Sequence, residues 1–201
     1  MPTPRLFIVA GPNGSGKSLF SKILTDSDFE VFDGDKHMTS LVKQFPETGS
    51  QALWSHIDEN IFKEEKDTAI RLRFNYAFET NFSSSNPMAS VRQFKDAGYE
   101  VHMIFMGLNS IEESIQRVEH RVRLGGHKVA EVSIRYNYEH GFKNLYKHFS
   151  EFNSTTLYDN SIPNSPEPAI PREILYITCD KLHLNTDQYP ECVKPVIELL
   201  G

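Results

Sequence analysis

The residues best suited to chemistry lie in one glycine-rich stretch near the amino terminus. It reads GPNGSGKS over residues 11–18 and matches the pattern G-x-x-x-x-G-K-[ST] at every fixed position. Such glycines let backbone N–H groups surround an anion, and the amino end of the following helix strengthens the attraction. Lys17 would contact the terminal phosphates, and the Ser18 hydroxyl would ligate Mg²⁺. The stretch predicts that ATP or GTP binds to Gly11, Pro12, Asn13, Gly14, Ser15, Gly16, Lys17 and Ser18, beside Phe20.

Carboxylates are expected near this loop, because three of them directly follow predicted strands. Asp33 and Asp35 follow residues 29–32, and Glu79 follows residues 74–78. In open α/β sheets, ligands bind at the carboxyl ends of the strands. Phosphoryl transfer needs a base that takes the proton of the acceptor hydroxyl, and carboxylates that hold metal-bound water. We expect Asp35 to be that base, because it lies just beyond the second strand.

The other polar residues of this region each allow more than one interpretation. Asp33 is either a substrate contact or a turn residue that bonds its own backbone. Glu79 ends an apolar strand, and both substrate binding and contact with metal-bound water are open to it. Thr80 and Asn81 are expected to line the acceptor pocket, although polar loop residues are often only solvated.

A second group of candidate residues consists of arginines on either side of a glycine pair. Arg117 and Arg121 are four residues apart and share one flank of a predicted helix, whereas Arg123 lies on the opposite flank. Arg135 lies on the next predicted helix. The arrangement fits a lid that closes over phosphates and supplies arginines to the transferring phosphoryl group. It also fits a solvated basic flank; behind a phosphate loop we favour the lid.

Strands and helices alternate along the chain, and this pattern predicts the scaffold that positions these residues. The continuous apolar run at residues 5–10 is typical of a strand buried on both faces of a parallel sheet. Alternation implies right-handed crossovers and a three-layer α/β P-loop kinase fold with a mostly parallel five-stranded sheet and a helical lid. Strands are expected at residues 5–10, 29–32, 74–78, 99–106 and 155–158, with a C-terminal edge hairpin at 174–178 and 182–184. Helices are expected at 17–25, within 36–73 with a break near 46–49, from 87 to 98, from 110 to 125, at 130–149 and at 189–200.

Length and composition limit the classes of function. The chain has 201 residues, which we expect to form one domain over residues 1–201. Its net charge of −6 argues against a nucleic-acid backbone as the main partner. The amino-terminal apolar run is too short for a signal peptide or a membrane span, so we expect a cytoplasmic protein. Cys179 and Cys192 make neither a disulfide framework nor a zinc site.

Together, these motifs resemble the zeta-toxin-like P-loop kinases over residues 6 to about 161. The resemblance is carried by GPNGSGKS, Phe32-Asp-Gly-Asp35, Phe78-Glu-Thr80, Arg117-Val-Glu-His-Arg-Val-Arg-Leu-Gly-Gly-His127 and Tyr158-Asp-Asn-Ser161. It implies ATP-dependent phosphorylation of a sugar hydroxyl on a small-molecule acceptor, which for the family's characterised toxins is UDP-N-acetylglucosamine. It also implies a protein antitoxin as a partner.

The resemblance extends to individual residues. It implies that Lys17 and Ser18 hold phosphate and Mg²⁺, and that Asp35 is the base. It implies that Glu79 and Thr80 contact the acceptor and that Asn160 lies near the adenine. The best-matched lid arginines are Arg121 and Arg135, with Arg117 and Arg123 as alternatives. The chain departs from the family pattern in the lid, where Gly-Gly-His replaces a longer stretch, and in residues 38–66.

A P-loop ATPase or nucleotide-dependent switch that acts on a protein partner is the alternative to a small-molecule kinase. It would require a segment that couples hydrolysis to motion. The sequence contains no Leu-Ser-Gly-Gly-Gln signature and no apolar strand that ends in a lone aspartate. Both absences favour the kinase.

Overall fold

The computed structural model of this chain describes residues 2–25, 30–126, 128–161, 170–178, 181–186, 189 and 193–200. Both cysteines, His127 and the first residue of the second predicted strand fall outside these ranges. Within them, no helix is long and apolar enough to cross a membrane.

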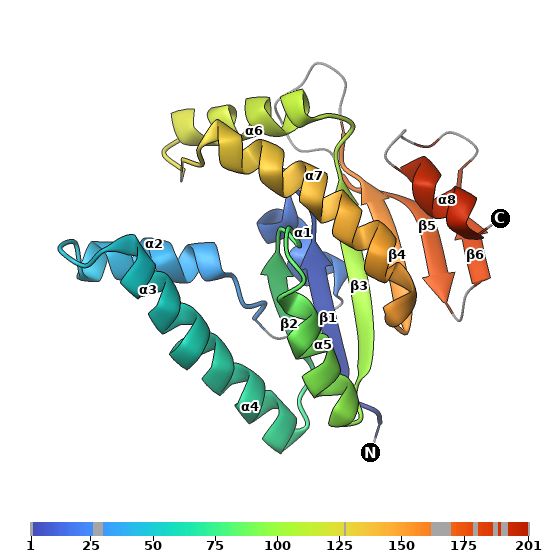
Figure 1. The fold of residues 1–201 in the computed structure, drawn as a ribbon, viewed down its shortest axis with the longest axis horizontal. Coiled ribbons are helices and arrows are strands. Elements are labelled where there is room, and N and C mark those ends of the chain that lie inside the picture. The colour runs from blue at the N-terminus through green and yellow to red at the C-terminus, as the bar shows by residue number, and fades with distance from the viewer. Residues whose placement is uncertain are drawn as a thin grey trace.

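The scaffold is a six-stranded sheet, as Figure 1 shows. Its order is β2-β1-β3-β4-β5-β6, and the first four strands in that order run parallel to their neighbours. The last two strands pair in antiparallel fashion and form the C-terminal hairpin at the edge. The predicted fold class is therefore confirmed. The strands are β1 (Arg5–Ala10), β2 (Tyr76–Thr80), β3 (Glu100–Gly107), β4 (Ser154–Asp159), β5 (Arg172–Thr178) and β6 (Lys181–Leu184).

The strand predicted at residues 29–32 is reduced to a single bridge between Phe32 and Phe78. The Phe32 amide donates to the carbonyl of Ala77 at 2.9 Å, and its carbonyl accepts from the Glu79 amide at 2.8 Å. The strand ends there because the next residue, Asp33, caps a helix with its side chain. The prediction was therefore too long, although Phe32 does pair in parallel with β2.

Helices cover both faces of the sheet. In Figure 1, α5 and α7 lie in front of the strands and α1 lies behind them, while α2, α3 and α4 form an arm beside the β2 edge. The helical region predicted at residues 36–73 is confirmed, including its break, since residues 45–49 are not helical. The elements are α1 (Lys17–Leu24), α2 (Gly34–Gln44), α3 (Ser50–His56), the π-helical segment η1 (Ile57–Phe62), α4 (Lys63–Leu72), α5 (Pro87–Asp96), α6 (Ile111–Arg123), α7 (Glu131–His148), the 3₁₀ segment η2 (Phe149–Glu151) and α8 (Lys194–Leu200).

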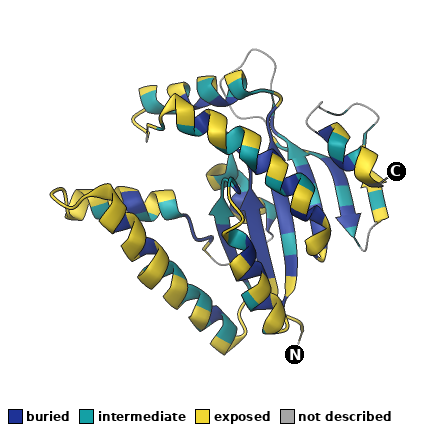
Figure 2. Ribbon diagram, viewed as in Figure 1, coloured by how far each residue is buried: buried dark blue, intermediate teal, exposed yellow. Residues whose placement is uncertain are grey.

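The burial of β1 on both faces explains why its sequence is apolar after Arg5. Leu6 and Ile8 belong to the larger core cluster, together with residues of α5 and α7. Phe7 points to the opposite face and packs with Ala77 and Ile104 in a smaller cluster. A strand covered on both faces has no position that faces water. Figure 2 shows the central strands as the most buried part of the molecule.

The loop after β2 has an uncommon backbone. Phe82 has a φ of 54°, in the left-handed region that residues with a side chain rarely adopt. Its amide donates to the Thr80 hydroxyl at 2.9 Å, and its carbonyl accepts from the Asn144 side-chain amide of α7 at 2.8 Å. The Phe82 ring is fully buried, so packing offsets the local strain. The loop thereby presents Asn81 at the carboxyl end of the sheet.

This loop predicts an unusual response to the substitution Gly141→Ala in the middle of α7. Alanine normally stabilises a helix relative to glycine by about 1 kcal/mol. At this position, however, the new Cβ would lie 2.8 Å from the Asn81 carbonyl oxygen. We expect a net loss of about 1–3 kcal/mol in the free energy of unfolding, measured by urea denaturation. Gly49→Ala, whose Cβ would meet nothing within 4 Å, is the control without a steric clash; because Gly49 is the N-cap of α3, it should lose no more than about 1 kcal/mol. Stabilisation by Gly141→Ala would contradict the close approach.

Candidate active site

The glycine-rich stretch forms a tight loop between β1 and α1. Gly11, Gly14 and Gly16 have φ values of 145°, 77° and 90°. A Cβ on Gly11 would lie 2.2 Å from the Met106 carbonyl oxygen, and one on Gly16 would lie 2.5 Å from the Asn160 side-chain nitrogen. Both the backbone angles and the neighbouring atoms therefore require glycine. The ring of Phe20 lies against Gly16, on the loop rather than in the cavity described below.

Lys17 is the central cation of the site. Its Nζ donates to the carbonyl oxygens of Gly11 at 2.8 Å and Pro12 at 3.0 Å, and to Asn81 Oδ1 at 3.1 Å. Burial lowers the pKa of Lys17, and the charge of Glu79 is the largest of the opposing influences. The strained loop after β2 thus supplies one of the three acceptors that position this ammonium group.

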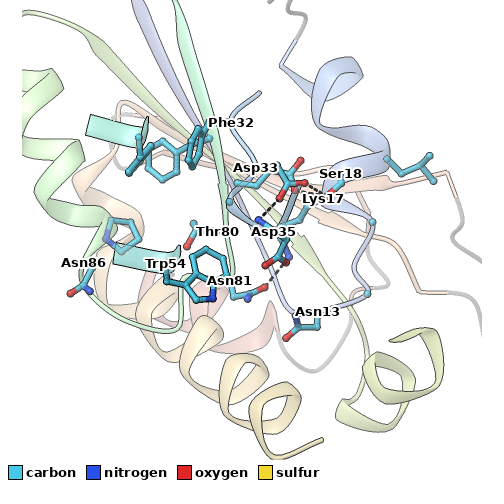
Figure 3. A pocket seen from close by; sticks show the side chains of 18 of the residues that line it. Asn13, Lys17, Ser18, Phe32, Asp33, Asp35, Trp54, Thr80, Asn81 and Asn86 are labelled. Carbon is cyan, nitrogen blue, oxygen red and sulfur yellow. Dashed lines mark hydrogen bonds between the residues drawn. The ribbon is translucent and has the colours of Figure 1, made fainter. Parts of the chain in front are cut away.

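Ser18 joins the two carboxylates that follow the adjacent strands (Figure 3). Its hydroxyl lies 2.9 Å from Asp33 Oδ2 and 2.7 Å from Glu79 Oε2. The other Asp33 oxygen accepts from the amides of Asp35 at 3.0 Å and Lys36 at 3.3 Å, and so caps α2. Asp33 therefore does bond its own backbone, as one of the two interpretations held, and it contacts Ser18 as well.

Negative charge accumulates around Ser18. Burial raises the pKa of Glu79, and the nearby charge of Asp33 raises it further. The donor set is a hydroxyl and two carboxylates, which are hard oxygen ligands of the kind that Mg²⁺ prefers. No group of three or more His, Cys, Asp or Glu side chains able to hold a metal occurs in the described part of the chain. A cation at Ser18 would therefore need phosphate or water oxygens to complete its shell.

A cavity of about 810 Å³ extends from the glycine-rich loop to the helical arm. Asp35, Thr80 and Asn81 all line it, in addition to Lys17 and Ser18. In Figure 3, Asp35 and Asn81 lie close to Lys17, and Trp54 lies beside Thr80 and Asn81. The structure therefore brings the predicted phosphate, base and acceptor residues to one cavity.

The far side of this cavity is a helical wall, which we define as Trp54, Asp58, Phe62 and Lys66. Sequence reasoning missed these residues. They recur at every fourth position across α3, η1 and α4. A regular α-helix with 3.6 residues per turn would rotate such a series steadily away from the cavity. The wider turns of the π-helical segment reduce that rotation, and π segments often occur at functional sites. The spacing of four was the signal available in the sequence.

The four candidate arginines occupy different environments. Arg121 lines the cavity, and its charge contributes to lowering the pKa of Lys17. Arg117 also borders the cavity but is only 4% exposed. Arg123 and Arg135 are exposed and do not line the cavity; Arg135 pairs with Glu131 at 2.8 Å and Glu112 at 3.7 Å. The arrangement thus supports a phosphate-directed role for Arg121 and gives no support to that role for Arg135.

Arg117 connects three segments of the molecule. Its guanidinium pairs with Glu113 at 3.0 Å, donates to the Asn160 carbonyl, and approaches the Gly14 carbonyl at 3.5 Å. Asn160 itself is fully buried and donates to the Ser15 carbonyl at 2.7 Å. Both residues therefore stabilise the glycine-rich loop by donating hydrogen bonds to its carbonyl groups. The predicted position of Asn160 near an adenine stays a prediction.

Helices α6 and α7 contact the tip of the same loop. The Ser114 hydroxyl donates to the Asn13 carbonyl, and the Asn137 side chain donates to Asn13 Oδ1 at 2.9 Å. Asn13 is consequently buried although it belongs to a loop. The two helices predicted to form a lid are thus attached directly to the glycine-rich loop.

Comparison with known proteins places the chain in a family. The family model described as zeta toxin matches residues 1–160 of the chain. An uncharacterized protein of Haemophilus influenzae is 28% identical over 133 residues, which cover 64% of this chain and 88% of that protein.

Solved structures share the fold at low identity. A chain from the PezAT chromosomal toxin–antitoxin system of Streptococcus pneumoniae aligns with a TM-score of 0.59 and 15% identity, over 85% of this chain and 72% of that chain. A chain of the AvrRxo1-ORF1:-ORF2 complex with ATP aligns with a TM-score of 0.64 and 10% identity, over 99% of this chain and 64% of that chain. At such identities, the matches establish the fold alone.

The buried position of Arg117 predicts a large effect on stability. Arg117→Gln leaves Glu113 without its cationic partner and removes a donor from the loop carbonyls. We expect the free energy of unfolding to fall by about 3 kcal/mol or more, as measured by urea denaturation. Arg123→Gln, on the exposed flank of the same helix, should change it by less than about 0.5 kcal/mol. Equal losses in the two variants would contradict the supporting role.

The raised pKa of Glu79 predicts how stability depends on pH. For an acid whose pKa in the folded state exceeds the ordinary 4.5, the folded state binds the proton more tightly, so stability falls as pH rises through that window. Glu79→Gln removes this fall. We expect the thermal midpoint of the nucleotide-free variant to exceed that of the wild type by an amount that grows with pH above 4.5. Glu139→Gln, at an exposed position on α7, is the control. A difference that does not depend on pH would contradict this account.

Proposed function

We propose that this chain, which belongs to the zeta toxin family, transfers the γ-phosphoryl group of ATP to a hydroxyl of a small molecule. The observation that carries the proposal is the continuous cavity, which the glycine-rich loop, Asp35 and the helical wall all line. A nucleotide at the loop and an acceptor at the wall would share this cavity. ATP is favoured as the donor because the AvrRxo1 complex of similar fold was solved with ATP.

The base in this proposal is Asp35. Asp33 is engaged through both oxygens, by Ser18 on one side and by the α2 amides on the other. Asp35 instead is exposed and lines the cavity. Its carboxylate would take the proton of the acceptor hydroxyl while that oxygen attacks the γ-phosphorus. The bond to the oxygen that bridges to the β-phosphate then breaks, and ADP leaves.

Charge around the transferring group would be balanced by Lys17 and Arg121, which enter the cavity from the loop and from α6. Ser18, Asp33 and Glu79 would hold Mg²⁺, which when bound neutralises phosphate charge. This assigns Asp33 and Glu79 to the metal rather than to the acceptor. Thr80 and Asn81 would contact the acceptor.

The acceptor and the partner remain to be identified by experiment. The family resemblance makes a nucleotide-sugar, with UDP-N-acetylglucosamine first, the compound to test. The structure from Streptococcus pneumoniae belongs to a toxin–antitoxin system, so a protein antitoxin is the partner to test.

The test of the base compares aspartate variants in a transfer assay with labelled ATP and candidate acceptors. We expect Asp35→Asn to lower the transfer rate by about 10²–10⁴-fold with an unchanged Kd for ATP, because only the proton acceptor is removed. Lys17→Ala should weaken ATP binding as well as transfer. Asp96→Asn, exposed on α5, should change neither.

Two results would oppose the proposal in different ways. Equal loss of ATP binding and transfer in Asp35→Asn would remove this residue as the base. Phosphate release that depends on a protein partner, with no labelled acceptor, would instead favour the nucleotide-dependent switch.

A further inference from the structure

The helical wall contains a cation that lies apart from the phosphate end of the cavity. Lys17, Arg117 and Arg121 come from the glycine-rich loop and α6. Lys66 comes from α4, in the arm beside the β2 edge of the sheet in Figure 1. It lines the same cavity as Trp54 and Phe62. The phosphates of a nucleotide on the loop therefore do not account for Lys66.

Contacts hold the Lys66 ammonium group at the cavity surface without neutralising it. Nζ donates to the Ser90 hydroxyl at 3.0 Å and lies 4.3 Å from the centre of the Phe62 ring. Among the residues that the structure describes, no carboxylate forms an ion pair with it within 4.0 Å. A hydroxyl and a ring face orient a cation without placing a full negative charge in contact with it.

The electrostatic surroundings of Lys66 are those of a group that gains from an anion. Burial lowers its pKa, and the charges of Asp67 and Asp58 oppose that effect. Asp67 accepts a hydrogen bond from Gln93 at 3.1 Å and does not line the cavity. Asp58 does line the cavity, on the same wall as Lys66 but two helical turns before it. A partly buried charge is favourable only when it is paired, and the cavity side is open for such a partner.

We propose that Lys66 binds an anionic group of the acceptor, a carboxylate or a phosphate, and so selects charged acceptors over neutral ones. This inference rests on the proposed function only in identifying the ligand as the acceptor; binding of an anion at Lys66 does not itself require phosphoryl transfer. Asp58 limits the site to a modest negative charge, because its carboxylate repels an anion bound beside it.

A purely structural role is the competing explanation, since the bond to Ser90 connects α4 to α5. The two explanations differ in what they predict for ligands. A structural lysine affects stability but not the preference between charged and neutral compounds. The test must therefore measure a preference.

Trp54 provides the measurement. It is the only tryptophan in the sequence, it lines the cavity, and it is 38% exposed. Its fluorescence can report binding at the wall without any transfer. The protein is first saturated with Mg²⁺ and a non-hydrolysable ATP analogue, so that phosphate compounds do not bind to the glycine-rich loop. Glucose, glucose 1-phosphate and glucuronate are then titrated; the last two separate phosphate from carboxylate recognition.

We expect at least one of the anionic probes to bind wild type about tenfold or more tightly than glucose, as a charge-assisted hydrogen bond allows. Lys66→Gln should abolish the preference, and Lys66→Arg should retain most of it. Asp58→Asn should tighten binding of the anionic probe. Lys63→Gln, exposed at the start of α4 and outside the cavity, is the matched control and should leave the preference unchanged.

If wild type binds neither anionic probe more tightly than glucose, the proposal is overturned. A preference that survives in Lys66→Gln would overturn it as well. If Lys66→Gln does not fold, which circular dichroism would show, Lys66→Arg and Asp58→Asn still decide the question in wild-type-like protein. Failure of the proposed function would appear elsewhere, as absence of transfer to any acceptor by a protein whose Trp54 fluorescence still responds to the anionic probe.

Discussion

The site depends on one constraint on the glycine-rich loop. Its carbonyl groups must accept hydrogen bonds on the side away from the ligand if its N–H groups are to face that ligand. Every carbonyl from residue 11 to residue 16 accepts a hydrogen bond. The donors come from Lys17, Ser114, Arg117, Asn160 and the first turn of α1. Buried backbone polar groups seldom stay unpaired, so this set of donors holds the loop in one shape. Helices α1 and α6 and the segment after β4 position these donors around the loop.

The two halves of the cavity are built in different ways. The proposed donor half consists of the glycine-rich loop after β1, supported by side chains from α6, α7 and the segment after β4. The proposed acceptor half consists of side chains on the helical arm, where Phe62 packs against Phe32 and Phe78. In the proposed function, a common phosphate site combined with a separate helical wall would let one scaffold serve different acceptors. The strained loop after β2 joins the halves, because Asn81 contacts Lys17 and also lines the cavity.

Much of the donor half could be predicted from sequence, because local spacing determines it. The pattern around Lys17 defined the loop, and strand patterns located all four strands that pair in parallel, β1 to β4. How deeply each candidate arginine is buried could not be predicted from its spacing. Arg117 and Arg121 share a helix flank, yet one supports the loop and the other lines the cavity, because they meet different partners. Arg135 failed to reach the cavity for a similar reason, since Glu131 and Glu112 pair with it. The helical wall was missed because its approach to the sheet involves residues far apart in the chain.

The geometry around Ser18 has a consequence for proton balance. A hydroxyl carries one proton, yet Ser18 lies within hydrogen-bond distance of two carboxylates. Only one of these contacts can use the serine proton, and burial together with the charge of Asp33 raises the pKa of Glu79. Protons and cations therefore compete for the same carboxylate oxygens. A cation that ligates both carboxylates requires their ionised forms, so nucleotide loading with such a cation is expected to become tighter as pH rises.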